Sequence, residues 1–199
     1  MSAIRYCQGS KNCRAHLLPG LIFVNYFFDK YHRRKDLALL VLVLKINSMS
    51  VETISKNEQL IRKLYQVAEE QKIKEFVSLF TDDGIFYDAS AGKKYQGADI
   101  GRTVEVYAAA FPDMHRELYS FYLTGNTVVV ELSLNGTHKG PLTLPMGTIP
   151  ATGKKMSTPC CDVFQIENGK VKLFNCYPSG TVLLEQLGVL EDLKSVLQK

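Results

Sequence analysis

Asp162 is the acidic residue whose position best suits acid–base chemistry. On a strand it shares one face with Cys160, Phe164 and Ile166, because side chains alternate between the two faces. Apolar neighbours separate a carboxylate from water, which raises its pKa toward neutrality and makes it a better general base. The structural alternative is a carboxylate that accepts a hydrogen bond from a nearby tyrosine, histidine or backbone amide.

Asp88 and His138 are two further candidates for the same chemistry. Asp88 lies at the end of a short predicted strand, where it either enters a pocket or caps the turn at residues 89–91. His138 continues the alternation of apolar residues from Val128 to Leu134, and a histidine titrates near neutral pH. It is a candidate donor or base, or else a structural histidine at the mouth of a cavity.

Aromatic and sulfur side chains near these residues are candidates to line a ligand pocket. A tyrosine hydroxyl can donate a hydrogen bond to a ligand oxygen, although a buried tyrosine more often belongs to the core. Cys176 is expected to be an inert thiol, since no base stands beside it in the sequence to lower its pKa. The candidate pocket residues are Tyr87, Tyr122, Cys160, Phe164, Cys176 and Tyr177.

The charge of the chain is unevenly distributed. Over 199 residues the net charge is +4, but residues 1–48 carry 8 basic and 2 acidic side chains, whereas residues 49–199 carry 16 and 18. The positive charge therefore belongs to the first quarter of the chain. The remainder has no basic surface of the kind that binds nucleic acid.

The five cysteines lack C-x-x-C spacing, and their odd number argues against a simple disulfide framework. Cysteine and histidine spacing typical of a metal site is also missing from the sequence, so no metal is expected. Reduced thiols in a cytoplasmic protein are the preferred interpretation.

Residues 1–48 differ from the rest of the chain. Their apolar runs at 17–28 and 37–44 are shorter than the roughly 20 residues that span a bilayer, and the order typical of a signal peptide is missing. Met49-Ser-Val-Glu52 reads like the opening of an independent protein. We expect residues 1–48 to be a poorly ordered extension or to precede the true start, with a membrane-surface anchor as the alternative. Residues 49–199 form one predicted domain.

Helical spacing comes first in this domain and strand alternation later. A capping box at Ser55-Lys-Asn-Glu58 predicts the start of a first helix; a second covers about 73–80, and Asp99 begins a third. Strands are predicted at 85–88, 117–123, 126–135, 156–166 and 171–177, with a tight turn at Asn168-Gly169, a long irregular connection over 136–153 and a final helix at 182–187. This order predicts an α+β domain with a curved antiparallel sheet wrapped on three N-terminal helices.

Several short motifs over residues 55–190 resemble, in order and spacing, those of the SnoaL-like polyketide cyclases. These cyclases belong to the superfamily of nuclear transport factor 2, ketosteroid isomerase and limonene epoxide hydrolase. The motifs are Tyr95-Gln-Gly97, Phe111-Pro-Asp113, Gly136-Thr-His-Lys-Gly140, Pro150-Ala-Thr-Gly-Lys154, Asp162-Val-Phe164, Asn168-Gly-Lys170, Tyr177 and Glu185-Gln-Leu-Gly188.

This resemblance implies a cone-shaped α+β barrel with an apolar cavity, paired into a homodimer through the open face of the sheet. It implies proton transfer by a buried carboxylate next to a ketone, with no cofactor. By the same resemblance the catalytic aspartate of the cyclases corresponds to Cys176 here, and a further acidic residue corresponds to Ser179. Asp162 and Asp88 correspond to positions that contribute polar groups to the cavity.

Two hypotheses follow. The first is an acid–base isomerase, cyclase or hydrolytic enzyme that acts on a small apolar carbonyl compound. The second is a non-catalytic module that binds a hydrophobic ligand or serves as a dimeric interaction domain. The enzyme hypothesis requires Asp162 or Asp88 to face an enclosed apolar cavity, within hydrogen-bond reach of His138 or a tyrosine.

Overall fold

The structure is a computed structural model that describes residues 34–190 of the chain. By its internal contacts the chain divides into two units, residues 1–48 and 49–199. Helix α2 covers Arg34–Glu69 and exposes every side chain from residue 41 to residue 49. The predictions for residues 1–33 lie outside the described residues, and the proposed start at Met49 stays a prediction. No helix in the described part of the chain is long and apolar enough to cross a membrane.

The helices of the second unit begin at other residues than the capping patterns predict. Helix α2 continues through Ser55, so the predicted capping box does not begin a helix; Glu58 instead forms an ion pair with Arg62 one turn later, at 2.7 Å. Helix α3 covers Ile73–Ser78. A 3₁₀ turn at Gly97–Ile100 precedes α4, which covers Gly101–Ala110. Asp99 lies inside that turn and pairs with Arg102 rather than capping α4.

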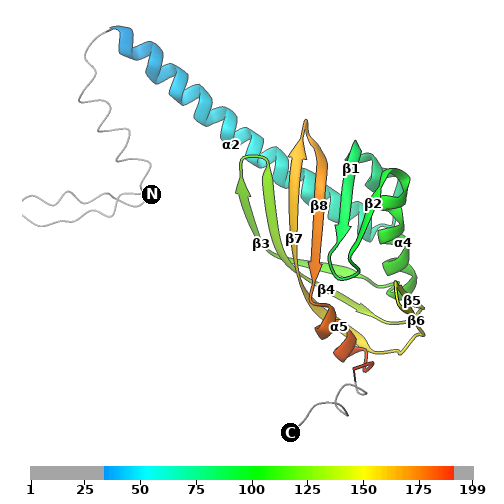
Figure 1. Ribbon diagram of the computed structural model, residues 1–199. Coiled ribbons are helices and arrows are strands. Elements are labelled where there is room, and N and C mark those ends of the chain that lie inside the picture. The colour runs from blue at the N-terminus through cyan, green and yellow to red at the C-terminus, as the bar shows by residue number, and fades with distance from the viewer. Residues whose placement is uncertain (1–33, 191–199) are drawn as a thin grey trace, which may run out of the picture. The chain divides into compact units, whose positions relative to one another are not determined.

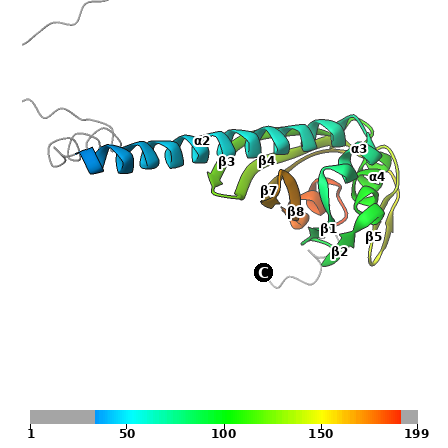
Figure 2. The same ribbon diagram turned by 90° about the horizontal axis from the view of Figure 1, so that it is seen from above.

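A six-stranded sheet forms the body of the fold, with the strand order β2-β1-β8-β7-β4-β3 (Figure 1). The strands are β1 (Phe80–Asp88), β2 (Lys93–Gln96), β3 (His115–Thr124), β4 (Thr127–Thr137), β7 (Lys155–Glu167) and β8 (Lys170–Pro178). The sheet is not fully antiparallel as predicted, because β1 pairs with β8 in parallel. Strand β2 is not among the strands predicted from the sequence. In the described part of the chain β2 and β3 are the two edges of the sheet, each paired on one side only, so the curved sheet does not close into the cone-shaped barrel that the resemblance implies (Figure 2).

The long central strands follow the predicted alternation closely. On β4, Val128, Val130, Leu132 and Leu134 are buried, and their partner strand β7 buries every second residue from Met156 to Ile166. The turn between β7 and β8 holds Asn168 and Gly169 at φ values of 51° and 73°. These positive φ values define the tight hairpin that an Asn-Gly pair favours, and they fix the register of β7 against β8.

The connection between β4 and β7 is more regular than predicted. It contains a small two-stranded sheet of β5 (Leu142–Leu144) and β6 (Gly147–Ile149). Helix α5 (Gly180–Gln186) then packs on β7. The side-chain amide of Gln186 accepts a hydrogen bond from the Ser157 N–H at 2.8 Å and donates one to the Ser157 C=O at 3.0 Å. One side chain of α5 therefore satisfies both backbone polar groups of Ser157 on β7.

The core between helix and sheet is centred on aromatic contacts. Phe164 on β7 is fully buried and lies with its ring centroid 4.2 Å from that of Phe174 on β8 and 6.0 Å from that of Tyr65 on α2. These contacts hold α2 against the two strands that carry the candidate site.

Replacing Phe164 with alanine is therefore expected to lower the free energy of unfolding by about 3–5 kcal/mol, because it removes buried apolar surface and leaves a cavity. Chemical denaturation of the wild type and the variant measures the difference. Tyr119→Ala is the matched control, since Tyr119 is 59% exposed and should change stability by less than about 1 kcal/mol. Equal losses in the two variants would contradict the assignment of the core.

Candidate functional site

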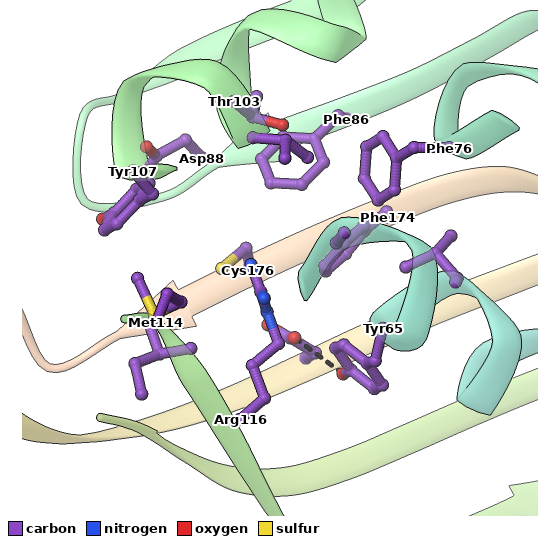
Figure 3. Close-up of a pocket in the computed structure, with 15 residues that line it drawn as sticks. Tyr65, Phe76, Phe86, Asp88, Thr103, Tyr107, Met114, Arg116, Phe174 and Cys176 are labelled. Atoms are coloured by element: carbon purple, nitrogen blue, oxygen red, sulfur yellow. Dashed lines mark hydrogen bonds between the residues drawn. The ribbon is translucent and has the colours of Figure 1, made fainter. Parts of the chain in front are cut away.

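A pocket lies between the helices and the concave face of the sheet (Figure 3). It offers about 50 Å³ of space to a water-sized molecule. One part of its wall is apolar and consists of Leu64, Ala68, Phe76, Phe86, Val104, Met114, Leu134 and Phe174. The polar groups that face it are Tyr65, Asp88, Thr103, Tyr107, Arg116, Asp162 and Cys176.

Asp162 is the buried carboxylate of this pocket. It is 2% exposed, accepts a hydrogen bond from the Tyr65 hydroxyl at 2.7 Å on one oxygen, and contacts the Cys160 thiol at 3.3 Å on the other. Burial raises the pKa of the Asp162 carboxyl, and the hydrogen bond from Tyr65 offsets only part of that shift. Burial and the nearby Asp162 raise the pKa of Tyr65 well above its usual value. Tyr65 therefore stays protonated and is the donor in the hydrogen bond to Asp162. Asp162 therefore faces the pocket with a tyrosine within hydrogen-bond reach, which is one part of the condition that the enzyme hypothesis sets.

Two thiols lie beside this carboxylate. Cys176 lines the pocket from β8, directly opposite Asp162 in the β7–β8 register, and its sulfur lies 3.7 Å from that of Cys160. The contact with Cys160, together with burial, raises the pKa of Cys176 well above the usual thiol value. The contact with Cys176 lowers the pKa of Cys160, whereas burial and the nearby Asp162 together raise it by a larger amount. The net shift of the Cys160 pKa is therefore upward. Both thiols are therefore protonated at neutral pH.

Arg116 brings the positive charge of the pocket and was not predicted from the sequence. It lies on β3 opposite Leu134 of β4, and both residues line the pocket. Its Nη1 atom is buried and has no hydrogen-bond partner among the described residues. Figure 3 shows its guanidinium directed into the pocket. The signal that could have found it is a cation two residues before Leu118, which alternation would place on the same face if the predicted strand at 117–123 began earlier.

Asp88 combines the two roles that the sequence left open. One of its oxygens accepts from the Ser90 N–H, the Ser90 hydroxyl and the Ala91 N–H at 2.7–3.0 Å, so the carboxylate caps the turn after β1. It also lines the pocket, opposite Cys176 in the parallel β1–β8 register. With three hydrogen bonds on one oxygen, it is more firmly held than Asp162.

His138 is fully buried but is not among the pocket-lining residues. Its ring lies 5.1 Å from that of Phe111, and its Nδ1 accepts from the Thr152 N–H at 3.2 Å. Since a backbone N–H can only donate, Nδ1 carries no proton in this contact. Burial lowers the pKa of His138. The contacts favour the structural alternative for this residue, in which it ties the end of β4 to the loop at Thr152.

The predicted pocket tyrosines occupy the opposite face of the sheet. Phe86 and Asp88 both line the pocket, so Tyr87 between them points the other way. Tyr177 follows the pocket residue Cys176 and is 45% exposed, and Tyr122 is 54% exposed, with its hydroxyl 3.0 Å from Glu131.

Two other predicted pocket residues, Phe164 and Cys160, are buried next to the pocket without lining it, and Ser179 precedes helix α5 outside the lining set. The tyrosines that do line the pocket are Tyr65 and Tyr107. They lie on helices α2 and α4, and no local sequence signal marks their hydroxyl groups as pocket groups.

The match to a family profile agrees with this architecture. Residues 58–186 match the SnoaL-like polyketide cyclase family, so the chain belongs to that family. The match includes the strands and helices that surround the pocket. Among curated proteins, no match was found.

Solved structures show the same fold at low sequence identity. A candidate SnoaL-like polyketide cyclase from Jannaschia sp. CCS1 superimposes with a TM-score of 0.60 at 15% identity, covering 68% of this chain and 93% of that chain. TsrD from Streptomyces laurentii gives a TM-score of 0.59 at 20% identity, covering 68% and 97%. A protein with a ketosteroid isomerase-like fold from Catenulispora acidiphila DSM 44928, in complex with trimethylamine, gives 0.56 at 18% identity, covering 65% and 92%. At these identities the likeness establishes the fold.

The raised pKa of Asp162 predicts a pH-dependent stability difference. A carboxyl whose folded pKa is raised stabilises the fold fully below its unfolded pKa near 3.8, and that contribution is lost as pH rises through the folded pKa. The stability of Asp162→Asn relative to the wild type should therefore increase as pH rises from about 4 toward neutrality. Urea denaturation of both proteins with EDTA present measures this difference.

Asp113→Asn is the matched control: its stability relative to the wild type should stay nearly constant above about pH 4 and change in the opposite direction only between about pH 2 and 4. The Thr137 N–H donates to Asp113 at 2.8 Å and lowers the pKa of that carboxyl to about 2. Its ionised form stabilises the fold above an unfolded pKa near 3.8, and the contribution is lost as pH falls through about 2. A wild-type advantage over Asp162→Asn that grows with pH would contradict the electrostatics assigned to the pocket.

Proposed function

We propose that this protein catalyses cofactor-free proton transfer next to the carbonyl group of a small apolar compound, as an isomerase or cyclase. The observation that carries the proposal is Asp162, a buried carboxylate in a largely apolar pocket that also contains the Nη1 of Arg116, which has no hydrogen-bond partner within residues 34–190. Membership of the polyketide cyclase family supports the same class of reaction. Asp162 takes the role that the family resemblance gave to position 176.

The reaction begins when Asp162 removes a proton from the carbon next to the carbonyl. The electron pair of the broken C–H bond moves onto the carbonyl oxygen and forms an enolate. Arg116 stabilises that oxygen, because a fixed positive charge in a water-poor site interacts strongly with developing negative charge. The enolate carbon then attacks a second carbonyl of the same molecule, or is protonated at another carbon. Asp162 returns the proton in either case.

The space in the pocket limits the substrate. About 50 Å³ is far below the several hundred Å³ of a pocket for a drug-sized ligand. The pocket as it stands therefore supports a compact compound in preference to a multi-ring polyketide. Met114, whose side chain is flexible, lines the wall and is the residue best suited to enlarge the pocket by moving.

Solvent-deuterium exchange tests the proposal directly. A panel of small cyclic ketones is incubated with the protein and EDTA in D₂O, and proton NMR follows the loss of signal at the carbon next to the carbonyl. Asp162→Asn should slow exchange by about 100-fold or more, because the base is removed. Arg116→Gln should also slow it, by about 10- to 100-fold, because the enolate loses its charge partner.

Asp82→Asn is the matched control, since Asp82 lies on β1 but is exposed and does not line the pocket. It should exchange substrate at the wild-type rate. Unchanged exchange in Asp162→Asn would show that another group is the base and would overturn the assignment.

The alternative is a module that binds an apolar ligand without catalysis. A thiol at Cys176 in place of the cyclase carboxylate favours it, and so does the small pocket. Ligand-observed NMR on the same ketone panel separates the two functions. Binding that is lost when Leu134 is replaced by tryptophan, without deuterium exchange by the wild type, would establish the binding module and exclude the enzyme.

We further propose that the protein is a cytoplasmic homodimer that pairs through the outer face of the sheet. Cys160, Cys161 and Cys176 are free thiols, as the reducing cytoplasm favours. The outer face carries Val129 and Val163 opposite each other on β4 and β7. Half-exposed apolar side chains in the middle of an open sheet support an interface.

Val163→Lys is expected to shift a dimer to a monomer, because it places a charge at the centre of this face. Sedimentation equilibrium at micromolar concentration measures the mass. Thr143→Glu, on the exposed side of the separate β5–β6 sheet, should leave the mass unchanged. A wild type that sediments as a monomer would contradict the dimer.

A further inference from the structure

Two thiols and a carboxylate converge beside the pocket in an arrangement that acid–base catalysis does not require. Cys160 and Asp162 are two residues apart on β7 and share its buried face, and Cys176 of β8 is the register partner of Asp162. One ligand atom from each of the three side chains can be chosen so that all lie within 4.8 Å of one another. The strand register, rather than a short sequence motif, brings them together.

The distances among these atoms match those around a tetrahedral zinc ion. Two sulfurs at about 2.3 Å from zinc lie about 3.8 Å apart in a tetrahedron, and a sulfur and a carboxylate oxygen lie about 3.5 Å apart. The two sulfurs here are separated by 3.7 Å, and the Cys160 sulfur lies 3.3 Å from the Asp162 oxygen. The ligand atoms therefore need little movement to surround an ion.

The surroundings of Asp162 suit a metal-binding carboxylate. Tyr65 donates to one oxygen, which orients the carboxylate and leaves the other oxygen on the side of the Cys160 thiol. Ligating carboxylates are commonly held by such a hydrogen bond. Two thiolates and one carboxylate with a divalent ion carry a net charge of −1, and Arg116 in the same pocket balances it.

A disulfide between the two cysteines fits the register less well. Cys160 is opposite Pro178 and Cys176 is opposite Asp162, so the two cysteines are diagonal and not directly paired. Diagonal neighbours on antiparallel strands lie about 7–8 Å apart, beyond the usual range for a disulfide of about 4.4–6.8 Å. An ion between the sulfurs bridges the extra distance.

We propose that Cys160, Asp162 and Cys176 form a binding site for Zn²⁺, with the fourth coordination position open to the pocket. Binding replaces the proton of each thiol by a bond to the metal, and these protons pass to solvent. The proposal goes beyond the proposed function and does not rest on it. If both hold, zinc occupies the carboxylate that acts as the base, so zinc inhibits proton transfer.

Titration of the reduced full-length protein with Co²⁺ tests the site, because cobalt bound to thiolates absorbs strongly in the near ultraviolet and tetrahedral cobalt absorbs in the visible. The wild type should develop both bands with one equivalent of Co²⁺, and Zn²⁺ should abolish them. Cys160→Ala and Cys176→Ala should each reduce the thiolate band and weaken Zn²⁺ binding at least 10-fold, measured by competition with a chromophoric chelator.

Cys161→Ala is the matched control, since Cys161 stands between two ligands on β7 but faces the other side of the sheet. It should keep the bands and the wild-type affinity. Cys7 and Cys13 are present in every variant and cannot produce a difference among them. Thermal unfolding confirms that each alanine variant is folded. Equal spectra and affinities in all four proteins, or no thiolate band in the wild type, would overturn the site. Both readouts are independent of catalysis, so they separate this inference from the proposed function.

Discussion

The hydrogen bond from Tyr65 to Asp162 is the interaction on which the rest of the site depends. It joins α2 to β7 across the interior at 2.7 Å, and it partly compensates for burying a carboxylate that water would otherwise solvate. Because a buried acid with few partners is costly, the surrounding fold has to hold both residues firmly. The ring of Phe164 does so by packing edge-to-face against Tyr65, and Phe174 packs on Phe164 in turn. A raised carboxyl pKa is the chemical result, and it follows from burial rather than from any sequence motif.

Strand register determines which groups meet at this carboxylate. Asp88, Cys176 and Asp162 lie side by side on β1, β8 and β7, because Cys176 is the register partner of both aspartates. This row explains how a family member can have a thiol where its relatives are expected to have an acid and still keep a carboxylate in the pocket: the acid lies on the neighbouring strand. The same row brings sulfur next to oxygen, so the proposed proton transfer and the proposed zinc site use the same carboxylate.

Alternation along the strands also explains why some predicted pocket residues do not line this pocket. A strand that turns Cys176 inward must turn Tyr177 outward, and one that turns Asp88 inward must turn Tyr87 outward. On a strand, the residue directly before or after a pocket residue is therefore expected on the opposite face of the sheet. Arg116 was missed because a charged residue near the start of a predicted strand ordinarily faces water. Here Leu134, the register partner of Arg116 on β4, lies on the concave face, and paired residues on neighbouring strands point to the same face. The side chain of Arg116 therefore lies on the concave face as well.

By itself, the sequence determined the α+β class, the alternation of β4 and β7, the Asn168-Gly169 turn and the burial of Asp162, because each depends on residues close together in the chain. It did not determine the parallel pairing of β1 with β8, the strand β2 or the missing closure of the sheet, because these depend on pairing between distant segments. The pocket belongs to the second group. Tyr65, Arg116 and Asp162 come from α2, β3 and β7, and only the curvature of the sheet and the packing of α2 bring a hydroxyl, a cation and a carboxylate into one pocket.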